Sequence, residues 1–122
     1  MIYNRKYRAL FFTDERGISP VLGYIEHLNI KERAKVLKYI EFLREHDGYL
    51  DEPYSKHIKG KIRELRVDFS KSRHRIFYFV FIEKNIVLLH AFSKKTEKTP
   101  LAEIKKAEDN YYKVITNKKL YE

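Results

Sequence analysis

The side chains best suited to chemistry in this chain of 122 residues are cations carried by three predicted strands. Arg66 and Arg75 lie on two consecutive strands, and Lys94 and Lys95 directly follow the third. A guanidinium group can donate two hydrogen bonds at once to a phosphate. Fixed cations can also stabilise the extra negative charge of a phosphorane-like transition state. The pattern therefore indicates a phosphate-binding surface.

A structural interpretation of the same residues stays open. Arg75 could instead form an ion pair with Glu64 or Asp68, and Lys94 and Lys95 could simply keep a strand edge soluble. Tyr78 likewise has two interpretations, because it could stack on a base or fill the core, and filling the core is the simpler one.

The distribution of charge supports the phosphate-binding interpretation. The net charge is +9, but residues 1–55 are balanced, residues 56–98 carry +8 and residues 99–122 carry +1. A basic field confined to one region attracts polyanions and is typical of nucleic-acid binding, whereas scattered charge would indicate only solubility. The further candidates for contacts with RNA are Lys56, Lys59, Lys61, Arg63, Arg73, His74, His90 and Lys98.

Several functional classes are excluded or disfavoured by the sequence. The chain has no cysteine, so disulfides and cysteine-ligated metal sites are excluded. It has no GxGxxG, P-loop or HExxH motif, and its five histidines lack metal-ligand spacing. No apolar run approaches the roughly 20 residues of a membrane helix, and the N-terminal residues do not resemble a signal peptide. We therefore expect a cytoplasmic protein without cofactor, metal or membrane partner.

The first half of the chain predicts one strand followed by two helices. The strand is expected over Lys6–Asp14. The first helix should begin with Ser19 as N-cap and Pro20 as its first residue. The second is expected over Lys31–Gly48, where Gly48 ends it and one apolar stripe follows the helical repeat through Ala34, Leu37, Ile40 and Leu43.

The second half predicts three antiparallel strands and a helix. Residues 51–61 read as a loop, and the strands as Ile62–Phe69, His74–Ile82 and Ile86–Ser93. The turn between the last two strands holds two or three residues, and this choice decides whether His90 shares a face with Arg75. Thr99 should cap the final helix.

These elements define the expected fold class. It is an α+β fold in which an N-terminal strand and a helical hairpin pack on a mostly antiparallel sheet, followed by a C-terminal helix. We expect the helices on one face of the sheet and one domain over residues 1–122.

The second half also carries a family resemblance. "IRELRVDFSKSRHRIFYFVFIEKNIVLLHAFSKKTEKTPLAEIKKA" resembles the RelE/HigB toxins of bacterial toxin–antitoxin pairs, and most closely their phage-derived HigB-like branch. That branch typically shows "WELR", "YRIFY" and "VLLHGFxKKTxKTPxxEIxxA", which correspond here to Arg63–Arg66, His74–Tyr78 and Val87–Ala107. The first half matches in layout only. The resemblance thus implies a RelE-like fold.

The resemblance implies an enzyme, a ribosome-dependent endoribonuclease that cuts mRNA in the ribosomal A site and so inhibits translation. In that chemistry the ribose 2′-OH attacks the adjacent phosphate. Arg66 and Arg75 correspond to the basic residues that hold the phosphate, and Lys94 or Lys95 to the basic residue after the last strand. Glu64 is the candidate general base. The alternatives are His90 and His74, since an imidazole titrates near neutral pH. The usual terminal tyrosine or histidine is not assigned; the tyrosines available are Tyr111, Tyr112 and Tyr121.

The resemblance also implies partners: the ribosome, mRNA and a HigA-like helix-turn-helix antitoxin with which the toxin would act as corepressor. Two other functions stay open. One is a basic module that binds RNA or a partner without catalysis, and the other is an enzyme acting on a small phosphorylated substrate. Substituting Arg75 separates the first two, because it should abolish cleavage by a nuclease but only weaken binding by a module.

Overall fold

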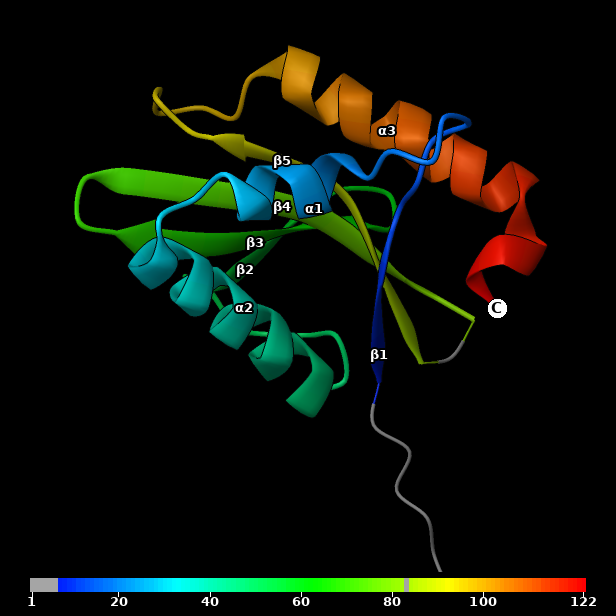
Figure 1. The fold of residues 1–122 in the computed structure, drawn as a ribbon, viewed down its shortest axis with the longest axis horizontal. Helices are drawn as coiled ribbons and strands as arrows, with labels where there is room; N and C mark the ends of the chain where they lie inside the picture. The colour runs from blue at the N-terminus through cyan, green and yellow to red at the C-terminus, as the bar shows by residue number, and fades with distance from the viewer. Residues whose placement is uncertain (1–6, 83) are drawn as a thin grey trace, which may run out of the picture.

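The computed structural model describes residues 7–82 and 84–122, and its centre is a five-stranded sheet of order β1-β5-β4-β3-β2 (Figure 1). Among the described strands, β1 and β5 pair in parallel and the other neighbouring strands pair antiparallel, so the sheet is mostly antiparallel, as predicted. The strands are β1 (Arg8–Phe11), β2 (Ser55–Lys59), β3 (Ile62–Phe69), β4 (Ser72–Phe81) and β5 (Asn85–Ser93). The helices are α1 (Pro20–Glu26), α2 (Ile30–Glu45), α3 (Leu101–Thr116) and the short 3-10 helix η1 (Lys118–Tyr121).

Helices cover both faces of the sheet, so the expectation of one covered face is wrong. α1 and α2 pack on one face and α3 on the other (Figure 1). On β4, Ile76 and Tyr78 belong to the core under α1 and α2, whereas Phe77 and Phe79 belong to the core under α3. A strand that is apolar on both sides needs cover on both sides. Tyr78 is fully buried, which confirms its interpretation as a core residue.

The sequence predicted three of the antiparallel strands, β3, β4 and β5, and missed β2. The bounds of β3 agree with the prediction. β2 was missed and read as loop, because "SKHIK" between Pro53 and Gly60 lacks a clear apolar face. It is an edge strand, where exposed lysines discourage pairing with another chain.

The helices depart from the predictions at several positions. Asn29 caps α2, accepting at Oδ1 from the Glu32 N–H at 2.9 Å. Val36, rather than Leu37, belongs to the buried stripe of α2, and Leu37 is 46% exposed. Thr99 does not cap α3, because the N-cap position is taken by Pro100, without a side-chain hydrogen bond. α2 ends at Glu45, three residues before the predicted end. His46 is the C-cap and Asp47, rather than Gly48, is the first left-handed residue after it, at φ +59°. The Gly48 N–H donates to the Leu43 carbonyl at 2.7 Å.

The register between β4 and β5 places His90. Phe81 pairs with Asn85, and a bulge lets Phe77 pair with His90 while Tyr78 pairs with Leu88. The extra residue brings His90 to the α3 side, which is also the side of Arg75. Among the described residues, no helix is long and apolar enough to cross a membrane.

Candidate functional site

Five cations gather on the sheet face that α3 covers. They lie near the segment that leads into α3. The register pairs Lys56 with Glu64, Arg66 with Arg75, and Asp68 with Arg73 across adjacent strands. Side chains paired in this way share a face. We call this surface the cationic face, and its members are Lys56, Glu64, Arg66, Asp68, Arg73, Arg75 and Lys94.

Glu64 is the buried centre of the cationic face. Its side chain is 1% exposed, and Oε1 lies 3.5 Å from Arg66 Nε and 4.0 Å from Arg75 Nε. Oε2 accepts a hydrogen bond from Thr99 Oγ1 at 3.2 Å. A buried carboxylate requires partners of this kind. Sequence reasoning missed the role of Thr99, because a contact across 35 residues leaves no local signal.

Arg75 is held firmly beneath this surface. It is 3% exposed, and its Nη1 donates to Asp68 Oδ1 at 2.7 Å and to the His74 carbonyl at 3.0 Å. The ion pairs with Glu64 and Asp68 that the structural interpretation expected are therefore both present. Its Nε is buried, has no hydrogen-bond partner among the described residues, and faces Glu64. Arg66, at 25% exposure, is the more accessible guanidinium.

The structure separates Lys94 from Lys95. Lys94 is 8% exposed and its backbone N–H donates to the Arg73 carbonyl at 2.8 Å, whereas Lys95 is exposed to solvent. Burial lowers the pKa of the Lys94 ammonium; the Glu64 carboxylate acts in the opposite direction, and Arg66 and neighbouring arginines lower the pKa further. A lowered pKa increases the neutral fraction of a lysine, which is the form that can accept a proton.

The two candidate histidines lie on different faces. His90 shares the face of Arg75, but its Nε2 is paired with Glu103 of α3 and its ring stacks with Phe77 and Phe92. His74 is 3% exposed on the opposite face, where its ring nitrogens contact Tyr24 Oη at 2.7 Å and Glu32 Oε2 at 3.1 Å. The structure therefore does not bring His74 to the cationic face.

The remaining predicted RNA-binding residues are also divided. Arg63 lies on the α2 side, where its Nε donates to Ser55 Oγ at 3.1 Å and its guanidinium lies 4.7 Å from the Tyr49 ring centre. Lys59 pairs with Glu108 of α3 at 3.0 Å. Lys61 lies in the exposed turn before β3, and Lys98 is exposed in the segment before α3. Of the eight candidates, the structure brings Lys56 and Arg73 onto the cationic face.

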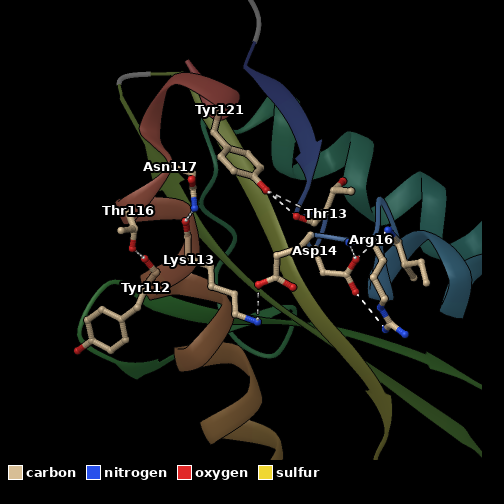
Figure 2. A network of polar contacts seen from close by, with 10 residues as sticks. Thr13, Asp14, Arg16, Tyr112, Lys113, Thr116, Asn117 and Tyr121 are labelled. Atoms are coloured by element: carbon tan, nitrogen blue, oxygen red, sulfur yellow. Dashed lines mark hydrogen bonds and ion pairs between the residues drawn. The ribbon is translucent and has the colours of Figure 1, made fainter.

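The unassigned tyrosines lie away from Arg75. Tyr121 is buried at the far end of α3, and its hydroxyl accepts a hydrogen bond from the Thr13 N–H at 3.1 Å (Figure 2). Tyr111 packs edge-on against Phe79 at 4.7 Å, and Tyr112 is 62% exposed. Tyr121 thus closes the C-terminal segment onto the end of β1.

The chemistry offered by the cationic face is binding and charge stabilisation at a phosphate. Within residues 7–82 and 84–122, no group of three or more His, Asp or Glu side chains could hold a metal ion. The groups available are guanidinium and ammonium donors around one buried carboxylate. Such an array suits an anion with several oxygens.

Comparison with known families gives one clear relationship. A model of the family described as Phage derived protein Gp49-like (DUF891) matches residues 23–112, about three quarters of the chain. This range contains α2 and all of the cationic face. No match was found among curated proteins.

Proposed function

Because the chain belongs to the phage-derived Gp49-like family, which is associated with toxin–antitoxin toxins of the RelE/HigB type, we propose that it is the toxin of such a pair. In this proposal it is a ribosome-dependent endoribonuclease of the HigB-like branch. It cuts mRNA by attack of a ribose 2′-OH on the adjacent phosphate and so stops translation.

The convergence of Arg66, Arg75 and Lys94 around Glu64 carries this proposal. Arg66, which is 25% exposed, binds the scissile phosphate, and Lys94 lies buried at the edge of the group beside it. Arg75 lies below them, oriented by Asp68, and adds positive potential where charge develops in the transition state. Because these positions are fixed before RNA binds, little reorganisation is needed at the moment of reaction.

The proton transfers follow from the same geometry. Lys94, in its neutral form, accepts the proton of the 2′-OH while the 2′ oxygen bonds to phosphorus and the bond to the 5′ oxygen breaks. Water supplies the proton to the leaving 5′ oxygen, which yields a 2′,3′-cyclic phosphate and a 5′-OH end. The lowered pKa of Lys94 increases its neutral fraction and supports this role.

Glu64 receives a different role from the one expected. Its carboxylate is buried and already engaged by Arg66, Arg75 and Thr99. It is therefore proposed as a positioning residue rather than the general base. His90 is engaged by Glu103 and packs beside the site.

The experiment that tests the function is cleavage of a reporter mRNA by purified protein, mapped by primer extension with and without translating ribosomes. Cuts are expected only with ribosomes and should be lost in Arg66→Ala, whose side chain is accessible enough for the variant to fold. Cuts on naked RNA would show that cleavage does not require the ribosome. If the folded wild-type protein cuts neither substrate, the proposal of a nuclease is contradicted.

One observation favours a second candidate, a basic module that binds RNA or a partner without catalysis. Glu64 and Arg75 are buried and mutually paired, and His90 is paired with Glu103, as in a purely structural network. This candidate requires RNA binding without cleavage in the same assay.

The family association implies an antitoxin partner. We propose that it is a HigA-like helix-turn-helix protein encoded beside this chain. Co-expression of the two adjacent reading frames should give a complex that binds their shared promoter, and a toxin recovered alone would count against this partner.

A further inference from the structure

A groove on the α2 side of the molecule has chemistry opposite to that of the cationic face. It encloses about 750 Å³ between the C-terminal half of α2, the loop over residues 47–51 and Tyr54, which precedes β2. α2 and α3 cover opposite faces of the sheet (Figure 1), so the groove and the cationic face lie on different sides. RNA on one side would leave the other accessible.

Aromatic rings form much of the wall of this groove. Tyr39 lies 5.6 Å from Phe42 and 6.0 Å, edge-on, from Tyr54, measured between ring centres. Tyr49 and Tyr54 are 55% and 50% exposed. Exposed tyrosines present both apolar area and a polar hydroxyl, a combination enriched where proteins bind one another.

Carboxylates line the same groove. Residues 39–54 contain five acidic side chains and one basic side chain, a net charge of −4 in a chain of +9. Glu41 is paired with Arg44 at 2.6 Å. Within the part of the chain that the structure describes, the carboxylates of Glu45, Asp47 and Asp51 form no hydrogen bond or ion pair. The negative charge of these three carboxylates attracts a cation and repels phosphate.

The wall rings already accept cations from this chain. The ammonium groups of Lys35 and Lys38 lie 5.7 Å and 5.8 Å from the ring centres of Tyr39 and Phe42. These distances fall within the range of cation–π attraction. An arginine or lysine entering the groove would meet aromatic faces and free carboxylates together.

The backbone around the groove is fixed in advance. Gly48 adopts φ +79°, and a Cβ at this position would lie 2.5 Å from Val80 Cγ2. The loop therefore packs closely against the sheet at position 48, where a side chain would clash and only glycine fits. Because the groove is preformed, little conformational entropy is lost when a partner binds.

We propose that this groove binds a basic segment of a partner protein, one in which arginine or lysine alternates with apolar side chains. Charge complementarity selects this occupant, and the acidic lining disfavours RNA. The inference goes beyond the nuclease proposal and does not rest on it, because none of the groove residues belongs to the cationic face.

The test is NMR titration of the ¹⁵N-labelled full chain with a capped twelve-residue peptide of alternating arginine and leucine. A matched peptide carries glutamate in place of arginine. The basic peptide should shift resonances over residues 39–54, and the acidic peptide should not. A single-stranded RNA oligonucleotide should leave these resonances unchanged.

Charge reversal makes the test specific. The double variant Glu45→Lys/Asp51→Lys should weaken peptide binding by about tenfold or more. The matched control Glu26→Lys/Asp109→Lys reverses two exposed acids elsewhere and should bind like the wild type. The proposal is overturned if no shifts occur, if both variants weaken binding equally, or if RNA shifts the groove. Shifts of the same residues on concentrating the protein alone would assign the groove to a second copy and also overturn it.

Discussion

The hydroxyl of Thr99 donates a hydrogen bond to Oε2 of Glu64 at 3.2 Å, across 35 residues of sequence. This bond ties the segment between β5 and α3 to the buried carboxylate of the cationic face. The cations of "FSKKTEKTP" in this segment differ in exposure. Lys94 is buried at the edge of the cationic face near Glu64, whereas Lys95 and Lys98 are exposed to solvent.

Removing this tie should loosen the site. Thr99→Val should lower the unfolding free energy by about 1 kcal/mol, the typical net value of one hydrogen bond, and should reduce mRNA cleavage because Lys94 is less well positioned. Denaturant unfolding and the ribosome-dependent assay measure the two effects. Thr96→Val is the matched control, because the Thr96 hydroxyl donates to the nearby Lys98 carbonyl in an exposed turn. Equal effects of the two substitutions would contradict the positioning role of Thr99.

Substituting Glu64 should move the pH dependence of cleavage. If Lys94 is the base, the rate rises with pH through its pKa, since only the neutral amine accepts a proton. The Glu64 carboxylate raises that pKa, so Glu64→Gln should shift the inflection to lower pH while keeping a rising profile. The measurement is the single-turnover rate against pH. An unchanged inflection would contradict the assignment of this pH dependence to Lys94, and complete loss of the pH-dependent limb would return Glu64 to the role of general base.

Arg75 should matter for stability as well as for cleavage. Arg75→Ala leaves the buried Glu64 with fewer cations and should lower the unfolding free energy by about 3 kcal/mol, the low end for breaking a buried ion pair. Arg66→Ala should cost less, because Arg66 is 25% exposed. Chemical denaturation of both variants tests this order. A smaller loss for Arg75→Ala than for Arg66→Ala would show that the buried network does not depend on Arg75.

Tyr121 should contribute to folding and not to chemistry. Tyr121→Phe removes the hydroxyl that accepts from the Thr13 N–H (Figure 2) and should lower the unfolding free energy by about 1 kcal/mol. The rate of mRNA cleavage should stay at the wild-type value. A large fall in rate in a folded Tyr121→Phe variant would place this tyrosine in the reaction and contradict the assignment to Lys94.

Local patterns accounted for much of the fold. Alternation of Leu65, Val67 and Phe69 with polar residues gave β3 its correct bounds, and a strand apolar on both sides was recognised in β4. A strand that is apolar on both sides needs cover on both faces, whereas the prediction placed all helices on one face. Val36 lies one position from the expected stripe residue Leu37, because the direction in which a helix packs is decided by its tertiary neighbours.

The candidate site was predictable in its residue types but not in its arrangement. Alternation placed Glu64 and Arg66 on one face, but only the second core beneath α3 makes Glu64 buried rather than exposed. The position of His90 depended on a bulge in β5, which has no sequence signal here. Lys94 and Lys95 likewise differ in burial, Lys94 being buried and Lys95 exposed, and adjacent lysines give no sequence signal for this difference.

The most direct measurement is the single-turnover rate of mRNA cleavage on programmed ribosomes for wild type, Lys94→Met and Lys95→Met. The two variants lose the same charge at adjacent positions. The expected result is a fall of about 10²- to 10⁴-fold for Lys94→Met, the usual contribution of a positioned acid or base, with Lys95→Met close to wild type. Wild-type rates in both variants, or equal losses in both, would contradict the proposed reaction centre at the cationic face.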